Sequence, residues 1–361
     1  MLWIHRSQSP VSNASGHAWM LYGAYGTTGR MILDEALRRG HRPLLAGRDP
    51  SRLAVLASDV GLDSLALSLD GSERATPALG GVSAVLNAAG PYFRTGGPLR
   101  KLCLEGAVSY VDVNGEIEDF QEAMRCDAAA RAKGVAVIPG AGFGVVFGEA
   151  LAVHVGRRLP DASWMRMSVA AASAGTSRGA ALSTASVLAG GGYAIAGGRL
   201  SARPMAFRTW RVGSKSQGVP SARFGAAPRA ELLAAHRLTG IDEIVAGVPM
   251  PLAGAIVLRV AGRLVGNLMS RRRMPERGEK PAQAGEDLGR QSHIWAEAGN
   301  PGGAQVLSVL ETGEGYRMAA AAAVRAIEEV IALRPAGAMT PAQAFGSHFA
   351  LSLPDTRICD L

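Results

Sequence analysis

The spacing of apolar and polar residues changes repeatedly along the first part of the chain. Short apolar runs predict buried strands, and apolar residues three or four positions apart predict helices between them. One such helix carries Met31, Ile32, Leu33, Ala36 and Leu37 on one face. The expected strands are 19–22, 43–48, 65–69, 81–87, 109–113 and 135–138, and the later helices are 51–58, 98–105 and 118–133. This alternation is typical of a doubly wound Rossmann domain with a parallel sheet.

A second region with mixed periodicity begins near Pro160. Its expected elements are a strand at 164–172, a helix from 176 to 188, sheet at 207–212, a helix at 251–269, paired strands at 294–297 and 304–311, and an Ala-rich helix ending near 333. We therefore predict an α/β protein whose N-terminal Rossmann domain is joined to a second, α+β domain. The expected boundaries are a loose tail at 1–17, the Rossmann domain at 18–158, a substrate and dimerisation domain at 159–312, and a helix and tail at 313–361 that return to the Rossmann domain.

Composition supports a large core. Of 361 residues, 48% are hydrophobic and 19% charged, which argues against bulk disorder. The net charge of +8 comes mostly from scattered arginines with no nucleic-acid motif, so we expect no nucleic-acid partner. Cys103, Cys126 and Cys359 are far apart and show no metal-ligand spacing, as expected for a cytoplasmic protein without a metal.

The turn between the first strand and first helix predicts a dinucleotide site. Gly23 permits the sharp turn, Gly26 lets the backbone approach a pyrophosphate, and Gly29 allows close helix–strand packing. The helix N-terminus presents free N–H groups to the phosphates, where Thr27 and Thr28 add hydroxyl donors. Tyr25 belongs to the same predicted cofactor turn. A glycine-rich turn in an unrelated α/β domain is the alternative.

The end of the second strand indicates NADP(H). An NAD site usually has an acid there, whereas this strand ends at Arg48, whose guanidinium suits a 2′-phosphate. Asp49 is nearby, but Asp49-Pro-Ser-Arg52 also fits an ordinary helix cap. Further predicted cofactor contacts are Asp70 after the third strand, and Ala88, Ala89, Gly90 and Pro91 after the fourth.

Ten segments spread over the chain carry a resemblance to a known family. They are 23–29, 46–48, 87–92, 96–99, Cys103, 110–116, 139–143, 176–179, 311–316 and 340–346. The chain resembles the saccharopine dehydrogenase-like oxidoreductases, and within them the branch often labelled trans-acting enoyl reductase. The resemblance implies NADPH-dependent reduction of a C=C or C=N bond. It leaves the substrate open, because the family includes lysine-pathway, polyamine and lipid-linked members.

One departure from the family pattern concerns the segment after the sixth strand. The family often has an acid and a proline after Gly-Phe, where this chain has Gly144 and Phe147, with Glu149 near the place of a second acid. If the first acid binds an amine-bearing substrate, its loss favours a more apolar substrate.

Several side chains are candidates for chemistry. Tyr92 could donate a proton or orient substrate, or could simply pack on its loop. Asp112 and Glu116 could orient substrate or a water, or could act as capping or dimer-contact carboxylates. Thr176, Ser177 and Arg178 open a predicted helix and could hold a carboxylate, phosphate or thioester carbonyl, or form an N-cap with a solvated arginine. Tyr316 could close the cleft or pack in the core.

The apolar segment 251–269 is interrupted by arginines and glycines, which argues against a transmembrane span. With the arginines up to 273 it could make a peripheral membrane contact or cover a substrate tunnel, or be a buried or dimer-facing helix. We expect a homodimeric, NADP(H)-dependent oxidoreductase that reduces an activated, thioester- or lipid-linked C=C bond of a small-molecule or lipid-like substrate. The alternatives are C=N chemistry on an amino-acid-like substrate, and a non-catalytic nucleotide-binding protein at a lipid surface or with a partner.

Overall fold

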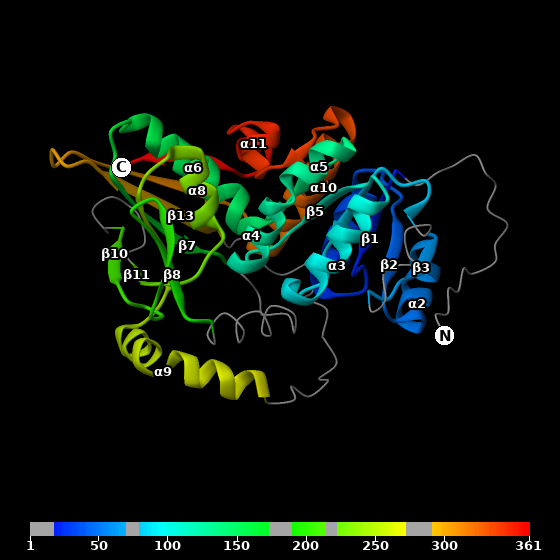
Figure 1. Ribbon diagram of the computed structural model, residues 1–361, viewed down its shortest axis with the longest axis horizontal. Coiled ribbons are helices and arrows are strands. Elements are labelled where there is room, and N and C mark those ends of the chain that lie inside the picture. Colours follow the sequence, from blue (N-terminus) through cyan, green and yellow to red (C-terminus); the bar gives the residue numbers. More distant parts are fainter. Residues whose placement is uncertain (1–17, 70–78, 173–189, 214–221, 272–290) are drawn as a thin grey trace. The chain divides into compact units, whose positions relative to one another are not determined.

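The computed structural model describes residues 18–69, 79–172, 190–213, 222–271 and 291–361, and for 263–271 the backbone only (Figure 1). The chain divides into two compact units. Unit 1 comprises 1–114, 118–142 and 319–344, and unit 2 comprises 115–117, 143–318 and 345–361. The division therefore falls earlier than the boundary expected at 158, and 345–361 lies in unit 2 instead of returning to the Rossmann domain.

Unit 1 contains a seven-stranded sheet in the order β15-β6-β5-β4-β1-β2-β3. All its strand pairs are parallel. The strands are β1 (Trp19–Tyr22), β2 (Leu44–Gly47), β3 (Ser64–Ala66), β4 (Ala84–Asn87), β5 (Ser109–Asp112), β6 (Ala136–Ile138) and β15 (Gly337–Ala338). Strands β1 to β6 follow the doubly wound Rossmann order, which confirms the predicted α/β fold class. The sequence pattern did not predict β15.

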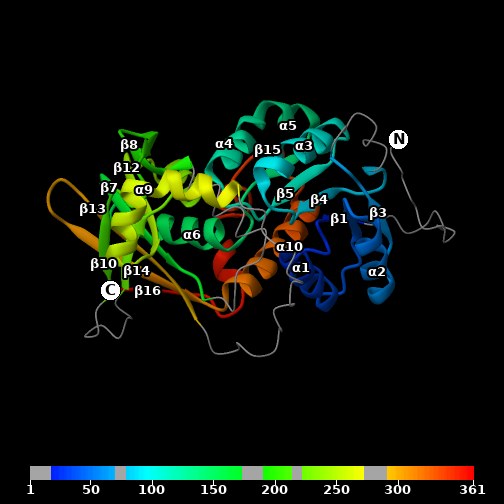
Figure 2. The same cartoon turned by 90° about the horizontal axis from the view of Figure 1, so that it is seen from below.

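Helices cover both faces of this sheet. They are α1 (Thr27–Arg38), α2 (Pro50–Val60), α3 (Tyr92–Glu105), α4 (Ile117–Arg125), α5 (Asp127–Lys133), α11 (Pro341–Phe345) and most of α10 (Gly315–Leu333). Figure 2 shows α1 and α10 on one face and α3 and α5 on the other. Arg39, which caps the C-terminus of α1, binds Glu328 of α10 at 3.2 Å.

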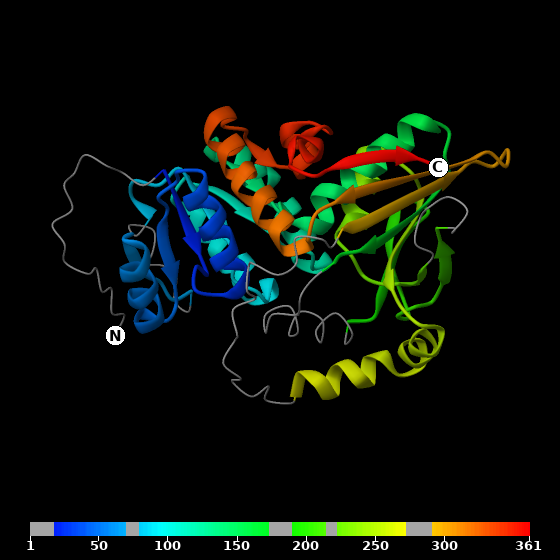
Figure 3. The ribbon, with the colours of Figure 1, turned by 180° about the vertical axis from the view of Figure 1, so that it is seen from behind.

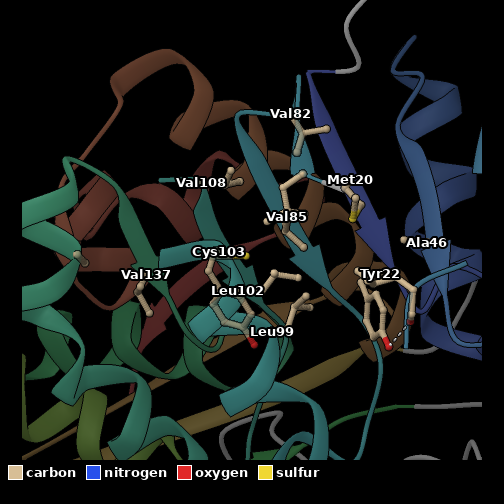
Figure 4. Packing of buried hydrophobic residues seen from close by; sticks show 14 of the residues in the cluster. Met20, Tyr22, Ala46, Val82, Val85, Leu99, Leu102, Cys103, Val108 and Val137 are labelled. Atoms are coloured by element: carbon tan, nitrogen blue, oxygen red, sulfur yellow. Dashed lines mark hydrogen bonds between the residues drawn. The ribbon is translucent and has the colours of Figure 1, made fainter. Parts of the chain in front are cut away.

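The core of unit 1 lies between the sheet and α3. Leu99, Leu102 and Cys103 on α3 pack among fully buried sheet residues such as Met20 and Val85 (Figure 4). Burial of these apolar side chains is the main favourable term for the unit.

Two helices of unit 1 differ from the expectation. Helix α3 begins at Tyr92, six positions before the expected start, because Tyr92, Gly96, Leu99 and Cys103 form one buried face that spans the internal Pro98. The helix expected over 118–133 breaks at Cys126, and the first-turn residue Asp127 of α5 accepts a 2.9 Å hydrogen bond from the Ala338 N–H of β15.

Unit 2 is built on a nine-stranded mixed sheet whose main path runs β10-β11-β12-β7-β13-β14-β16. Its strands are β7 (Trp164–Ala170), β8 (Gly192–Ala196), β9 (Arg199–Arg203), β10 (Thr209–Val212), β11 (Ala222–Ala226), β12 (Glu243–Pro249), β13 (Ser292–Gly299), β14 (Gln305–Thr312) and β16 (Arg357–Asp360). The antiparallel β13–β14 pair agrees with the predicted strands, and β16 beside it was not predicted (Figure 3).

The helices of unit 2 are α6 (Phe143–Arg158), α8 (Glu231–Thr239), α9 (Leu252–Arg271) and the short 3-10 helix η4 (Phe349–Ser352). Helix α6 packs against α8 and against strands β13 and β14. Helix α9 confirms the helix expected at 251–269, and none of the described helices is long and apolar enough to cross a membrane. Tyr316 lies in the first turn of α10.

Candidate functional site

The predicted glycine turn joins β1 to α1 in unit 1. Gly23 has a φ of +87°, and a Cβ there would lie 2.8 Å from the Ala89 Cβ, so only glycine fits. A Cβ on Gly29 would overlap the Gly23 carbonyl oxygen, which explains the close packing of helix on turn. Gly26 is the N-cap of α1 and carries no side chain, so the amide groups of the first turn, including Thr27 and Thr28, are left open.

The loop after β4 lies against this turn. The Ala88 N–H donates to the Tyr22 carbonyl at 2.9 Å, and Ala89 contacts Gly23. The Asn87 side chain fixes this loop, since its Oδ1 accepts the Ala89 N–H at 3.0 Å. Gly90 and Pro91 follow, joined by a cis peptide bond, and lead into α3. The turn after β1 and the loop after β4 thus lie together at the carboxyl ends of neighbouring strands, where a doubly wound sheet binds its ligand.

The end of β2 has a basic character. Arg48 directly follows the strand and its side chain is exposed. Asp49 caps α2, because its Oδ1 accepts the Ser51 and Arg52 N–H groups at 3.0 and 3.1 Å. The cap reading of Asp49 is therefore confirmed. Asp70, the other predicted acid, lies outside the described residues.

Tyr25 connects the glycine turn to the end of β2. Its ring fills the space above Gly47, where a Cβ would lie 2.5 Å from Cε1. Its hydroxyl accepts the Asp49 N–H at 3.2 Å, and the Arg52 guanidinium lies 4.7 Å from the ring centroid. Arg52 therefore stacks on Tyr25 in a cation–π contact beside Arg48.

A buried polar network joins the ends of β4 and β5. Arg100 binds Asp119 with two hydrogen bonds of 2.8 and 2.7 Å, and Asn114 donates to the same carboxylate at 2.7 Å. The Tyr110 hydroxyl accepts from the Asn87 amide at 3.1 Å. Burial lowers the pKa of Arg100, but the hydrogen bonds to Asp119 and the nearby charges outweigh it and raise the pKa above its ordinary value.

This network explains two family-like segments. A Cβ on Gly96 would lie 2.5 Å from Asp119 Oδ1, so the segment 96–99 needs glycine at its first position. The segment 110–116 supplies Tyr110, Asp112 and Asn114, all buried. Arg100 and Asp119 were missed by the sequence reasoning, because nothing in their spacing of nineteen residues marks them as partners.

Asp112 is the buried carboxylate at the end of β5. Its Oδ1 accepts the Asn114 and Gly140 N–H groups at 2.9 and 2.8 Å, while its Oδ2 has no hydrogen-bond partner among the described residues. Burial and the negative charge of Asp119 raise the pKa of Asp112 to about 6, although the two N–H groups oppose this. Such a group can hold a proton close to neutral pH.

Unit 2 brings other predicted segments together. The Ala230 N–H donates to the Gly115 carbonyl at 3.4 Å, next to the buried Glu116. The Gly315 N–H donates to the Ala172 carbonyl at 2.9 Å, and the next residue, Tyr316, is half-buried. Thr176, Ser177 and Arg178 lie outside the described residues, and Tyr92 is a buried residue of unit 1.

A buried ion pair lies beside Gly144, the position at which this chain differs from the family pattern. The sequence did not predict this pair. Glu231 is fully buried, and its Oε1 accepts from the Arg229 guanidinium, at 3.0 Å from Nε. A Cβ on Gly144 would overlap this Oε1. Oε2 of Glu231 has no hydrogen-bond partner among the described residues. A carboxylate from α8 thus occupies the space beside position 144, so the glycine at this position does not indicate an apolar substrate.

Fold and turn together define a dinucleotide-binding Rossmann protein. Residues 19–138 match the family model described as the saccharopine dehydrogenase NADP binding domain. Residues 19–138 therefore form an NADP(H)-binding Rossmann domain, and NADP(H) is its cofactor. The residues present fit that cofactor, since Gly26 leaves the helix N-terminus open, Asp49 is engaged and Arg48 is free to meet a 2′-phosphate.

Two further comparisons place the chain. It is 29% identical to the human saccharopine dehydrogenase-like oxidoreductase over 142 residues, which are 39% of this chain and 30% of the human protein. Its structure is similar to the apo saccharopine dehydrogenase (L-Glu forming) of Saccharomyces cerevisiae, with a TM-score of 0.60 and 9% identity over 95% of this chain and 99% of that one. At this identity the yeast enzyme shares the fold alone. The enoyl reductase branch receives no support from either comparison.

Proposed function

We propose that the protein is an NADP(H)-dependent oxidoreductase that acts on a C=N bond or the corresponding amine. We infer the substrate class from Glu231. This residue is a buried carboxylate whose Oε2 lacks a hydrogen-bond donor among the described residues. An iminium or ammonium N–H supplies such a donor, and a buried acceptor left unpaired costs free energy. The match of residues 19–138 to the NADP binding domain model and the similarity to the human saccharopine dehydrogenase-like oxidoreductase support an NADP(H)-dependent oxidoreductase.

Each unit has its own part in this proposal. When bound, NADPH supplies the hydride, which adds to the carbon of the C=N bond while a proton adds to the nitrogen. The turn at Gly23, Gly26 and Gly29 holds the pyrophosphate and Arg48 the 2′-phosphate. Asp112, with its pKa raised to about 6, holds or passes the proton, and Tyr92, also in unit 1, is the candidate donor.

A C=C reduction remains the second candidate. The observation that favours it is the apolar, solvent-facing side of α9, where Val260 is 84% exposed, because such a surface suits a lipid-linked substrate. A nucleotide-binding protein without catalysis is the rival outside enzyme chemistry.

The deciding experiment follows NADPH oxidation by the purified chain with a panel of imines and α-keto acid–amine pairs, and with enoyl thioesters as the second arm. Turnover with the imine panel supports the proposal, and turnover with enoyl thioesters alone overturns it in favour of C=C chemistry. NADPH binding without turnover in either arm favours the non-catalytic rival.

Glu231→Gln is the matched variant, expected to raise KM for the amine-bearing substrate while NADPH affinity stays unchanged. Tyr92→Phe tests the proton donor, since it should lower kcat with cofactor binding intact.

A further inference from the structure

Helix α9 presents an apolar face to solvent. Leu252, Ile256, Val257 and Val260 are 49%, 54%, 55% and 84% exposed, and their spacing places them along one side of the helix. The opposite side carries the fully buried Ala255. A surface helix of a globular protein normally turns its apolar residues toward the core. The exposed apolar face of α9 therefore indicates an interaction surface.

The charged residues of α9 are all arginines. The sequence Leu252–Arg271 contains no Asp or Glu, and its only charged residues are arginines at 259, 263 and 271. Arg259 is held in place, since its Nε and Nη2 donate to the Ala206 carbonyl at 3.0 and 2.6 Å. Arg203, at the end of the neighbouring strand β9, is exposed. The described part of this surface therefore combines apolar side chains with the guanidinium groups of Arg203 and Arg259.

A cavity of about 310 Å³ opens beside the same helix. Its lining includes Arg203 and Arg259 together with the apolar side chains Met205, Leu258 and Val260. Two guanidinium groups suit a phosphate, and the apolar wall suits the first methylenes of an acyl chain. The cavity thus has the chemistry of an anionic lipid headgroup site at the edge of the apolar face.

We infer that α9 lies on the surface of a bilayer containing anionic lipids, with its apolar face at the acyl boundary and a lipid phosphate between Arg203 and Arg259. A basic amphipathic helix without acids has the composition of such interfacial helices. Charge argues against a second copy of the chain as the occupant, because a two-fold contact between α9 helices would bring arginines of the same sign together. This inference is independent of the reaction proposed above.

The test is flotation of the full chain with phosphatidylcholine vesicles, with and without phosphatidylglycerol. The chain should bind the anionic vesicles and lose binding at high salt. Val260→Asp and Ile256→Asp should each weaken vesicle binding about ten-fold or more, because they place a carboxylate in the apolar face. Val55→Asp on α2, 60% exposed, is the matched control and should bind like the wild type. An unchanged thermal unfolding profile, including the transition of unit 2, shows that each variant is folded.

The charge arm uses Arg203→Gln, which should weaken binding to anionic vesicles about five-fold. Arg125→Gln, an exposed arginine on α4 of unit 1, should leave it unchanged. Equal binding of wild type and Val260→Asp would overturn the inference, as would equal binding to neutral and anionic vesicles. Loss of self-association in Val260→Asp, measured by sedimentation without vesicle binding, would assign the face to a second copy instead.

Discussion

Arg48 and Asp49 are neighbours with different tasks. The Asp49 carboxylate is used by the N-terminus of α2, whereas the Arg48 side chain extends into solvent from the end of β2. Arg48→Ala should weaken NADPH binding by about ten- to a hundred-fold, the loss expected for a charge-assisted hydrogen bond, and leave NADH binding nearly unchanged. Calorimetric titration with both cofactors measures this difference. Arg38→Ala, an exposed arginine near the end of α1, is the control, and equal losses for both cofactors would remove Arg48 from the 2′-phosphate site.

Tyr25 should act on cofactor choice through its neighbours. Its ring supports Arg52 and its hydroxyl holds the Asp49 N–H, so it positions the loop that carries Arg48. Tyr25→Leu should reduce the ratio of NADPH to NADH affinity by about three- to ten-fold, because Arg52 loses its cation–π partner. Tyr25→Phe keeps the ring and should lose less. A ratio that is unchanged in Tyr25→Leu, with both affinities equally reduced, would show that Tyr25 only supports the fold.

Asp112 should make the stability of unit 1 depend on pH. Its pKa is raised to about 6 in the folded protein, from an ordinary value near 4, so the folded state binds the proton more tightly. Its contribution therefore favours folding below about pH 4 and is lost as the pH rises through 6. Asp112→Asn cannot titrate. The Tm of the variant relative to wild type should therefore rise from pH 4.5 to pH 7.5, by several degrees for a difference of about 2 kcal/mol. The same difference in Tm at both values would contradict the raised pKa.

At the scale of single elements, the sequence predicts well those helices, strands and turns that are determined by residues close together in the chain. The periods of β1, α1 and β2 and the glycines between them are local, and all were found as expected. Helix α3 was placed too late, because Pro98 is a strong helix-start signal that tertiary packing overrides. The Arg100–Asp119 and Glu231–Gly144 contacts could not be predicted, since they join positions whose proximity exists only after folding.

The packing of α6 on α8 gives a test at this scale. A methyl group at Gly144 would overlap the Glu231 carboxylate, so Gly144→Ala should destabilise unit 2 by about 1 to 3 kcal/mol. In a chain that already carries Glu231→Ala the same methyl group finds space, and the cost should largely disappear. The measurement is a double-mutant cycle of unfolding free energies, with a coupling of at least about 1 kcal/mol.

Gly97→Ala on α3 is the control for that cycle. A Cβ at Gly97 meets nothing within 4 Å, and the residue lies inside a helix, so alanine should be neutral or stabilising by up to about 1 kcal/mol. Additive effects of Gly144→Ala and Glu231→Ala would mean that the two residues do not compete for one space. In that case α8 would not supply the carboxylate in place of position 144.

On the scale of the whole molecule, the sequence predicts two domains but not where the chain crosses between them. The C-terminal part passes through both units, since β15 pairs with β6 in unit 1 and β16 pairs with β14 in unit 2. Strand β15 has only two residues and β16 only four, too short for a pattern of alternating residues to stand out. The expectation that 313–361 returns as a whole to the Rossmann domain missed this division.

Two truncations separate these contributions. A chain ending at Phe345 loses β16 but keeps β15, whose backbone is held by the bonds from Gly337 N–H to Val135 O at 2.9 Å and Met339 N–H to Val137 O at 3.0 Å. It should retain NADPH affinity within about two-fold, because unit 1 keeps all its strands, while the sheet of unit 2 loses an edge and becomes easier to unfold. A chain ending at Arg334 loses both strands. It leaves the edge of β6 unpaired and removes the Ala338 N–H from the Asp127 carboxylate, so NADPH affinity should fall as well. Hydrogen exchange resolved along the chain, measured with and without NADPH, distinguishes the two units. If the shorter truncation at Phe345 loses NADPH binding as completely as the longer one, the cofactor site depends on unit 2 and the assignment of binding to unit 1 alone fails.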